Sequence, residues 1–156
     1  MKQQATEKLC PNVSEIELIY KSKVKAIDRP TVRSSSDAYQ LFLEHWDKNK
    51  IEYVEQFKAM FLNRANRVLA IYEISTGGVS QTIADPKQIF TAALKLNAHN
   101  LIACHNHPTC NLKPSKADEQ LTEMMVQAGK FLQLPVIDHL IISPEGYLSF
   151  ADEGLL

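Results

Sequence analysis

Alternating apolar and polar residues predict a strand near the start of the chain. Between residues 14 and 26, apolar residues such as Ile16 and Leu18 alternate with polar ones. A period of two is typical of a strand with one solvent-facing side. We therefore predict an N-terminal extension over residues 1–30 that contains one strand.

Three helices are predicted from their capping residues. Ser34 opens a polar cluster, Asp85 precedes a proline, and Ser115 follows another proline, each ahead of an amphipathic stripe. Side chains of these types accept hydrogen bonds from the free N–H groups of a first helical turn. In the third helix the stripe expected to face the core is Leu121, Met124, Met125, Ala128 and Leu132.

Two apolar runs in the middle of the chain predict a hairpin. Residues 52–62 and 67–76 flank the polar cluster at residues 63–66. The second run is mainly apolar on both faces, which predicts a central strand covered on both sides. It would carry Glu73 into a mostly buried layer. A short strand is predicted next, around residues 79–84.

The remaining apolar runs predict strands around residues 100–104, 136–142 and 147–150, with turn residues between them. Strands and helices therefore alternate along the chain, and hairpins are interspersed among them. This order predicts an α/β fold, a three-layer-like sandwich in which helices flank both sides of a mixed β-sheet.

Composition is that of an ordinary globular domain. The 156 residues are 45% hydrophobic and 22% charged, with a net charge of -1, so no broad basic surface for nucleic acid is expected. No apolar run approaches the ~20 residues of a membrane-spanning helix. Three cysteines and no secretory signal predict a cytoplasmic protein without a disulfide framework and without membrane association.

Two histidines and a carboxylate form a candidate metal site. His105 and His107 follow an apolar strand at positions i and i+2, so their side chains point to the same face. Pro108 ends the strand, and Asp118 falls in the first turn of the helix that starts at Ser115. Two imidazoles and one carboxylate suit Zn²⁺ and leave a fourth position for water, as in catalytic sites.

Each part of this pattern also has a purely structural interpretation. Ser115 and Asp118 match a helix capping box, and His105 alone would more often be a hydrogen-bonded strand histidine. The conjunction of two histidines on one strand face with a carboxylate at the next helix start favours the metal site.

The pattern resembles the JAMM or MPN-plus metalloprotease signature, an upstream Glu followed by His-x-His and then Ser-x-x-Asp. The surrounding residues resemble the RadC-like JAB domain more closely. The segments that carry this resemblance are residues 77–78, 105–108, 114–115, 138–142 and 147–150. The resemblance assigns residues 31–156 to a RadC-like JAB/MPN domain and implies the JAB/MPN fold, with its cytidine-deaminase-like architecture.

The resemblance also implies a role for each site residue. His105, His107 and Asp118 would bind one Zn²⁺ per chain, Glu73 would act as general acid/base, and Ser115 would help to stabilise an oxyanion. Zn²⁺ polarises a carbonyl and lowers the pKa of a bound water to ~7. Glu73 is chosen for its place before Gly77 and Gly78, whereas Glu55 lies further upstream on the preceding strand and is the poorer candidate.

Two features near the site leave alternatives open. Thr109-Cys110 stands where the family usually has Ser-Gly, so Cys110 is either tolerated variation or an inhibitory, redox-sensitive position. His139 follows Asp138, and we favour a structural hydrogen-bonded pair there.

The function implied by the resemblance is a zinc-dependent metallopeptidase-type hydrolase that acts on a peptide or isopeptide bond of a protein or peptide substrate. The alternative is a RadC-like factor of DNA repair or mobile elements, associated weakly or indirectly with the repair machinery and without strong intrinsic DNA binding. A metal-free scaffold is a third possibility. The Pro-Cys-x-x-Cys element of zinc deaminases is absent. Substrate identity and oligomeric state stay open.

Overall fold

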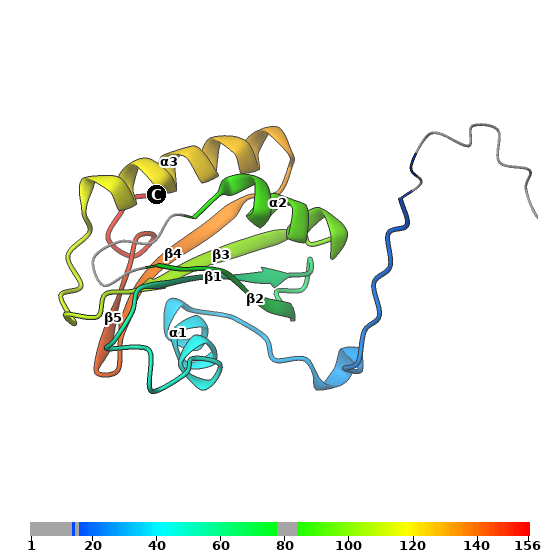
Figure 1. Cartoon of the computed structure of the whole chain (residues 1–156). Coiled ribbons are helices and arrows are strands. Elements are labelled where there is room, and N and C mark those ends of the chain that lie inside the picture. The colour runs from blue at the N-terminus through cyan, green and yellow to red at the C-terminus, as the bar shows by residue number, and fades with distance from the viewer. Residues whose placement is uncertain (1–13, 15, 78–83) are drawn as a thin grey trace, which may run out of the picture.

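A five-stranded sheet forms the centre of the computed structural model, which describes residues 14, 16–77 and 84–156 (Figure 1). The strands are β1 (Gln56–Leu62), β2 (Val68–Thr76), β3 (Asn100–Asn106), β4 (Val136–Ser143) and β5 (Gly146–Ser149). Their order in the sheet is β2-β1-β3-β4-β5. Only β3 and β4 pair in parallel, so the sheet is mixed, as predicted.

Helices cover both faces of the sheet. They are α1 (Ser35–Glu44), α2 (Pro86–Lys95) and α3 (Lys116–Phe131). A single 3-10 turn, η1 (Ala26–Asp28), precedes them and has no buried residue. Figure 1 shows α1 on one face and α2 and α3 on the other. The side chains of Ser34, Asp85 and Ser115 each accept a backbone N–H of the following first turn, which confirms the three predicted helix starts.

Each face of the sheet has its own hydrophobic core. The core under α1 includes Phe42, Trp46, Met60, Ile102, Cys104 and Leu140. The core under α2 and α3 includes Phe57, Phe61, Ile89, Phe90, Ala103 and Met125. Alternate residues of β1 and β3 enter opposite cores, as the pleat of a strand requires. The predicted three-layer α/β sandwich is therefore confirmed.

The central strand of the N-terminal hairpin is β1, not β2. Every residue of β1 is buried, because β1 has a partner on each side and helices above and below. β2 pairs with β1 alone and is largely half-buried or exposed, with Tyr72 48% exposed. The prediction of a doubly covered strand over residues 67–76 is wrong, because β2 lies at the edge of the sheet.

The predicted N-terminal strand is not formed by the part of the segment that the structure describes, residues 14 and 16–25. Among the described residues no strand pairs with this part, and Ile16 is 87% exposed. The side chain of Arg67, just before β2, donates to the carbonyls of Ala26 and Ile27. The Val68 N–H donates to the Pro30 carbonyl, and Thr31 bridges to Arg67. The predicted strand over residues 79–84 lies outside the described residues except for its last position.

No helix within the described ranges combines the length and the apolar character that crossing a membrane would require.

Candidate metal centre

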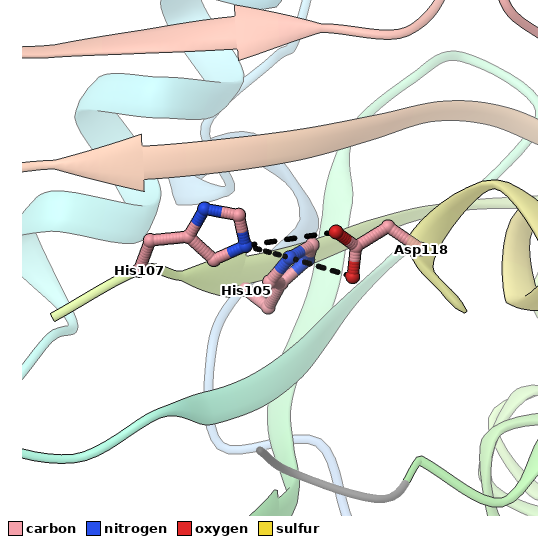
Figure 2. A group of neighbouring side chains, drawn as sticks. All are labelled: His105, His107 and Asp118. Carbon is pink, nitrogen blue, oxygen red and sulfur yellow. Dashed lines mark hydrogen bonds and ion pairs between the residues drawn. The ribbon is translucent and has the colours of Figure 1, made fainter. Parts of the chain in front are cut away.

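The end of β3 and the start of α3 bring three potential metal ligands together (Figure 2). The Nε2 atoms of His105 and His107 are 3.0 Å apart. Asp118 places Oδ1 at 3.2 Å from Nε2 of His105 and Oδ2 at 3.6 Å from Nε2 of His107. The sequence prediction that these three side chains converge is therefore matched by their positions, and the group could hold a metal ion.

The separations of the three ligand atoms fit a small tetrahedral cation. Ligand atoms bonded at ~2.0–2.1 Å to a tetrahedral ion lie about 3.3 Å from one another. The observed separations of 3.0, 3.2 and 3.6 Å bracket this value. The His105 side chain is 1% exposed, whereas those of His107 and Asp118 are 17% and 13% exposed. The group is therefore partly open to solvent on the side of His107.

The ring nitrogen that does not face the ligand group, Nδ1, is hydrogen-bonded to another protein group in both His105 and His107. Nδ1 of His107 donates to the carbonyl of Asn111, because a carbonyl can only accept. Nδ1 of His105 lies 2.9 Å from Nε2 of His139. Metal-bound histidines usually have such a partner on their other nitrogen, and it fixes the orientation of the ring.

Burial and hydrogen bonding act in opposite directions on Asp118. Burial alone would raise the pKa of its carboxyl, but the neighbouring imidazoles of His105 and His107 and the hydrogen bond from the Ser115 hydroxyl hold that pKa well below its usual range. The pKa of His107 is raised, chiefly by the hydrogen bond to Asp118 and further by the Asn111 carbonyl and the charge of Glu55. Without a metal ion, the site thus favours an ionised carboxylate and a protonated imidazole.

Ser115 acts on Asp118 rather than facing outward. Its hydroxyl donates to Oδ2 of Asp118 at 2.7 Å, and its backbone N–H donates to the same oxygen. The Asp118 N–H returns a hydrogen bond to the Ser115 hydroxyl, which completes a capping box. The capping box and the ligand group therefore coexist. Because a hydroxyl has one proton, Ser115 in this geometry cannot also donate to an oxyanion.

Glu73 is not brought to the ligand group. Its carboxylate accepts hydrogen bonds from Gln56 and Thr76 and lies 3.7 Å from Nζ of Lys58. Lys58 pairs with Glu73 on one side and with Cys104 on the other, so these side chains share one face of the sheet. That is the α1 face, where Lys58 lies over the Trp46 ring. His105, the next residue of β3, points to the opposite face.

Glu55 is the carboxylate that the sheet register directs toward the site. In the antiparallel pair of β1 and β3, Phe57 lies opposite His105. Continuing this register by two residues places Glu55 opposite His107, on the same face as His105. The Glu55 charge contributes to the raised pKa of His107, as expected of a nearby carboxylate. Glu55 ranked below Glu73 on sequence because Glu73 precedes Gly77 and Gly78, and the register between β1 and β3 cannot be seen in either strand alone.

His139 lies beside the site rather than in a side-chain pair with Asp138. Asp138 accepts the backbone N–H of His139 and is held by Ser149 and Ala151. The His139 ring instead contacts His105 and the Thr122 hydroxyl. Complete burial lowers the pKa of His139 well below its usual range, and the neighbouring His105 acts in the same direction. The predicted hydrogen-bonded pair of Asp138 and His139 therefore exists, but it involves the backbone N–H of His139 and not its ring.

Cys110 occupies a backbone conformation that favours glycine. Its φ is 58°, in the left-handed region, and its N–H donates to the carbonyl of His107 to close the turn after the histidines. Its thiol is 3.9 Å from Oε1 of Glu52 and is not part of the ligand group.

The match to a family model covers this entire arrangement. The model of the RadC-like JAB domain matches residues 32–155, which include all five strands and the ligand group. The chain belongs to the RadC-like JAB domain family.

Curated proteins similar to the chain are called UPF0758 proteins. One from Flavobacterium johnsoniae is 44% identical over 101 residues, which cover 65% of this chain and 44% of that protein. One from Fusobacterium nucleatum is 34% identical over 145 residues, or 89% of this chain and 61% of that protein. The chain thus spans between about two fifths and three fifths of the length of these two members of the RadC family.

Proposed function

We propose that this RadC-like JAB domain is a zinc-dependent hydrolase of metallopeptidase type, acting on a peptide or isopeptide bond. The observation that carries the proposal is the convergence of two imidazole nitrogens and one carboxylate. The Nδ1 atoms of both histidines and the Asp118 carboxylate are also hydrogen-bonded to neighbouring protein groups.

The donor set supports zinc over other common ions. Two neutral imidazoles and a carboxylate are borderline ligands, whereas Mg²⁺ and Ca²⁺ prefer sites made of oxygen. Three protein ligands are the usual number in catalytic zinc sites, which keep one position open. The side chains of His107 and Asp118 are partly exposed, so the open position would lie on their side of the group.

Each protein group would have a defined part in the reaction. Zn²⁺, when bound, supplies Lewis-acid polarisation of the scissile carbonyl and acidifies water. Glu55 would accept the proton of the attacking water and pass it to the leaving amine, as a carboxylate within reach of both can do. Ser115 would hold the Asp118 carboxylate in position, and would have to release it before donating to an oxyanion.

The substrate class is supported by the likeness to the JAMM signature and by the chemistry of the site. Amide hydrolysis needs an activated water, a polarised carbonyl and a carboxylate that transfers a proton, and the proposed groups provide all three.

The experiment that tests the proposal is the metal content of the protein purified without added metal. We expect about one zinc per chain in the parent, and loss of zinc from His107→Ala and from Asp118→Ala while circular dichroism shows an intact fold. The zinc protein is then assayed against a panel of peptide and isopeptide substrates.

A parent that binds no zinc, even after reconstitution at neutral pH, would contradict the proposal. It would bring forward a metal-free or DNA-associated role. DNA binding that weakens steeply with salt, in a protein without zinc, would support that alternative.

A further inference from the structure

Two buried residues lie behind His105 and outside the ligand group. His139 on β4 and Thr122 on α3 are 0% and 2% exposed. Together they form a hydrogen-bonded chain that runs from the backbone of α3 to the ring of His105.

The donor and acceptor roles in this series of hydrogen bonds follow from the Asp118 carbonyl, which can only accept. The Thr122 hydroxyl is 2.6 Å from the Asp118 carbonyl, so its single proton goes to that carbonyl. Thr122 Oγ1 is also 2.6 Å from Nδ1 of His139. Because the hydroxyl proton is already used, Nδ1 of His139 must be the donor in this second bond.

The next bond fixes the proton on His105. The His139 ring is fully buried and no carboxylate contacts it in the described part of the chain, so it is neutral, with its proton on Nδ1. Its Nε2 is then an acceptor. The partner at 2.9 Å, Nδ1 of His105, must donate. In a neutral His105 ring, a proton on Nδ1 leaves Nε2 unprotonated, and Nε2 is the atom that faces His107 and Asp118.

Aromatic packing holds the two rings in this relation. Phe150 stacks on His139 with ring centroids 4.8 Å apart, and Phe57 stacks on His105 with centroids 6.0 Å apart. Within the described residues, the His139 ring has no hydrogen-bond partners except Thr122 and His105. Each group in the series therefore donates to the next one: His105 to His139, His139 to Thr122, and Thr122 to the Asp118 carbonyl.

We propose that His139, with Thr122, is a positioning residue that keeps His105 in the tautomer able to bind a metal ion. The inference deepens the proposed function, because the tautomer has this consequence only if the site binds metal. His139 would act through His105 and would touch neither metal nor substrate.

Two measurements on the full chain test this inference. The first is the ring ¹⁵N spectrum of the metal-free protein, which distinguishes a protonated Nδ1 from a protonated Nε2 on His105. The second is zinc affinity by competition with a chromogenic chelator. The parent should show His105 with the proton on Nδ1.

Variants separate the hydrogen bond from packing. His139→Phe keeps a buried ring but removes the acceptor, and should mix the His105 tautomers and weaken zinc binding by about 10–100-fold. His139→Gln can offer an oxygen to the same N–H and should restore most of the affinity. Thr122→Val should shift both readouts in the direction of His139→Phe. Ser149→Ala, which removes a neighbouring bond to Asp138, should change neither.

Parental zinc affinity in folded His139→Phe, or a parental His105 with its proton on Nε2, would overturn the inference. If His139→Phe does not fold, parental affinity and tautomer in Thr122→Val would overturn it instead. A parent that binds no zinc would contradict the proposed function, and the ¹⁵N spectra of the metal-free proteins would still decide the role of His139.

Discussion

Glu55 and Glu73 lie on different faces of the sheet, and this difference predicts opposite results for the same substitution. Glu55→Gln should retain zinc and lower kcat by about 10²–10⁴-fold, because it removes the group proposed to transfer the proton. Glu73→Gln is the matched control and should leave kcat unchanged, since its carboxylate is bound to Lys58, Gln56 and Thr76. Steady-state kinetics at equal zinc loading tests the pair. A loss of kcat in Glu73→Gln alone would restore the assignment made from the sequence.

His107 predicts how zinc affinity depends on pH. Its pKa is raised above the usual ~6.5, first by Asp118 and then by the Asn111 carbonyl and Glu55. Because zinc must displace this proton, affinity should fall as the pH drops below that raised pKa, by about tenfold per unit for each proton released, and level off above it.

Competition titrations between about pH 5.5 and 8.5 measure this dependence. Glu55→Gln should move the midpoint to lower pH, because one of the charges that raise the His107 pKa is removed. A zinc affinity that stays constant across the range would contradict this account.

The backbone conformation of Cys110 predicts a gain in stability when the residue is replaced by glycine. At φ 58° a residue with a Cβ is disfavoured by roughly 1–2 kcal/mol, while glycine adds unfolded-state entropy worth about 0.5–1 kcal/mol. Cys110→Gly should therefore raise the free energy of unfolding by up to ~1.5 kcal/mol. Cys110→Ala keeps the Cβ and should be near neutral in urea denaturation. Equal gains in both variants would locate the effect in the thiol rather than in the backbone.

At the scale of elements, the stripe predicted for α3 is confirmed in part. Met125 is buried and Leu121 and Ala128 pack half-buried against the core, whereas Met124 is 53% exposed and Leu132 is 36% exposed. The hydrophobic pattern missed the buried Thr122 and Gly129, because a hydroxyl and a glycine carry no apolar signal. Thr122 is buried for its hydrogen bonds, and Gly129 is buried because the chain after the helix folds back closely against it.

That close approach predicts a loss of stability from a substitution that normally stabilises helices. A Cβ at Gly129 would lie 2.5 Å from the Leu134 carbonyl oxygen. Alanine gains about 1 kcal/mol of helix propensity over glycine, but the forced displacement costs about 1–3 kcal/mol, so Gly129→Ala should destabilise the protein. Urea denaturation measures the effect. Gln120→Ala, on the exposed side of the same helix, should not destabilise, and a more stable Gly129→Ala would show that the loop relaxes freely.

For the whole molecule, zinc is expected to raise Tm, because the ligand group joins β3 to α3. A ligand that binds only the folded state adds about 4 kcal/mol at a thousand times its Kd. Calorimetry with zinc and with chelator tests this expectation. The matched control is His107→Ala, whose Tm should not respond to zinc. A zinc-dependent shift that persists in that variant would point to binding elsewhere.

Features of the fold and of the site that depend on neighbouring residues could be predicted from the sequence, whereas features that depend on pairing between distant segments could not. Capping residues and the His-x-His and Ser-x-x-Asp patterns are local, and they located the three helix starts and the three side chains that converge. Long-range pairing is not local. The edge position of β2 and the opposition of Glu55 to His107 arise only when β1 pairs with β3. The exposed N-terminal segment has a strand pattern but pairs with no strand of the described residues, so pattern alone was insufficient there.

The grouping of the ligands within one β3-α3-β4 unit has a consequence for the order of folding. His105, His107, Asp118, Thr122 and His139 all come from that unit. Paired residues are 35–36 positions apart between β3 and β4 and 38–48 positions apart between β1 and β3, so the unit closes the shorter loops. Glu55 joins only when the more distant β1 docks against β3. We therefore expect a nascent chain to acquire its ion before its proton-transfer group, so that hydrolysis begins only after the sheet is complete.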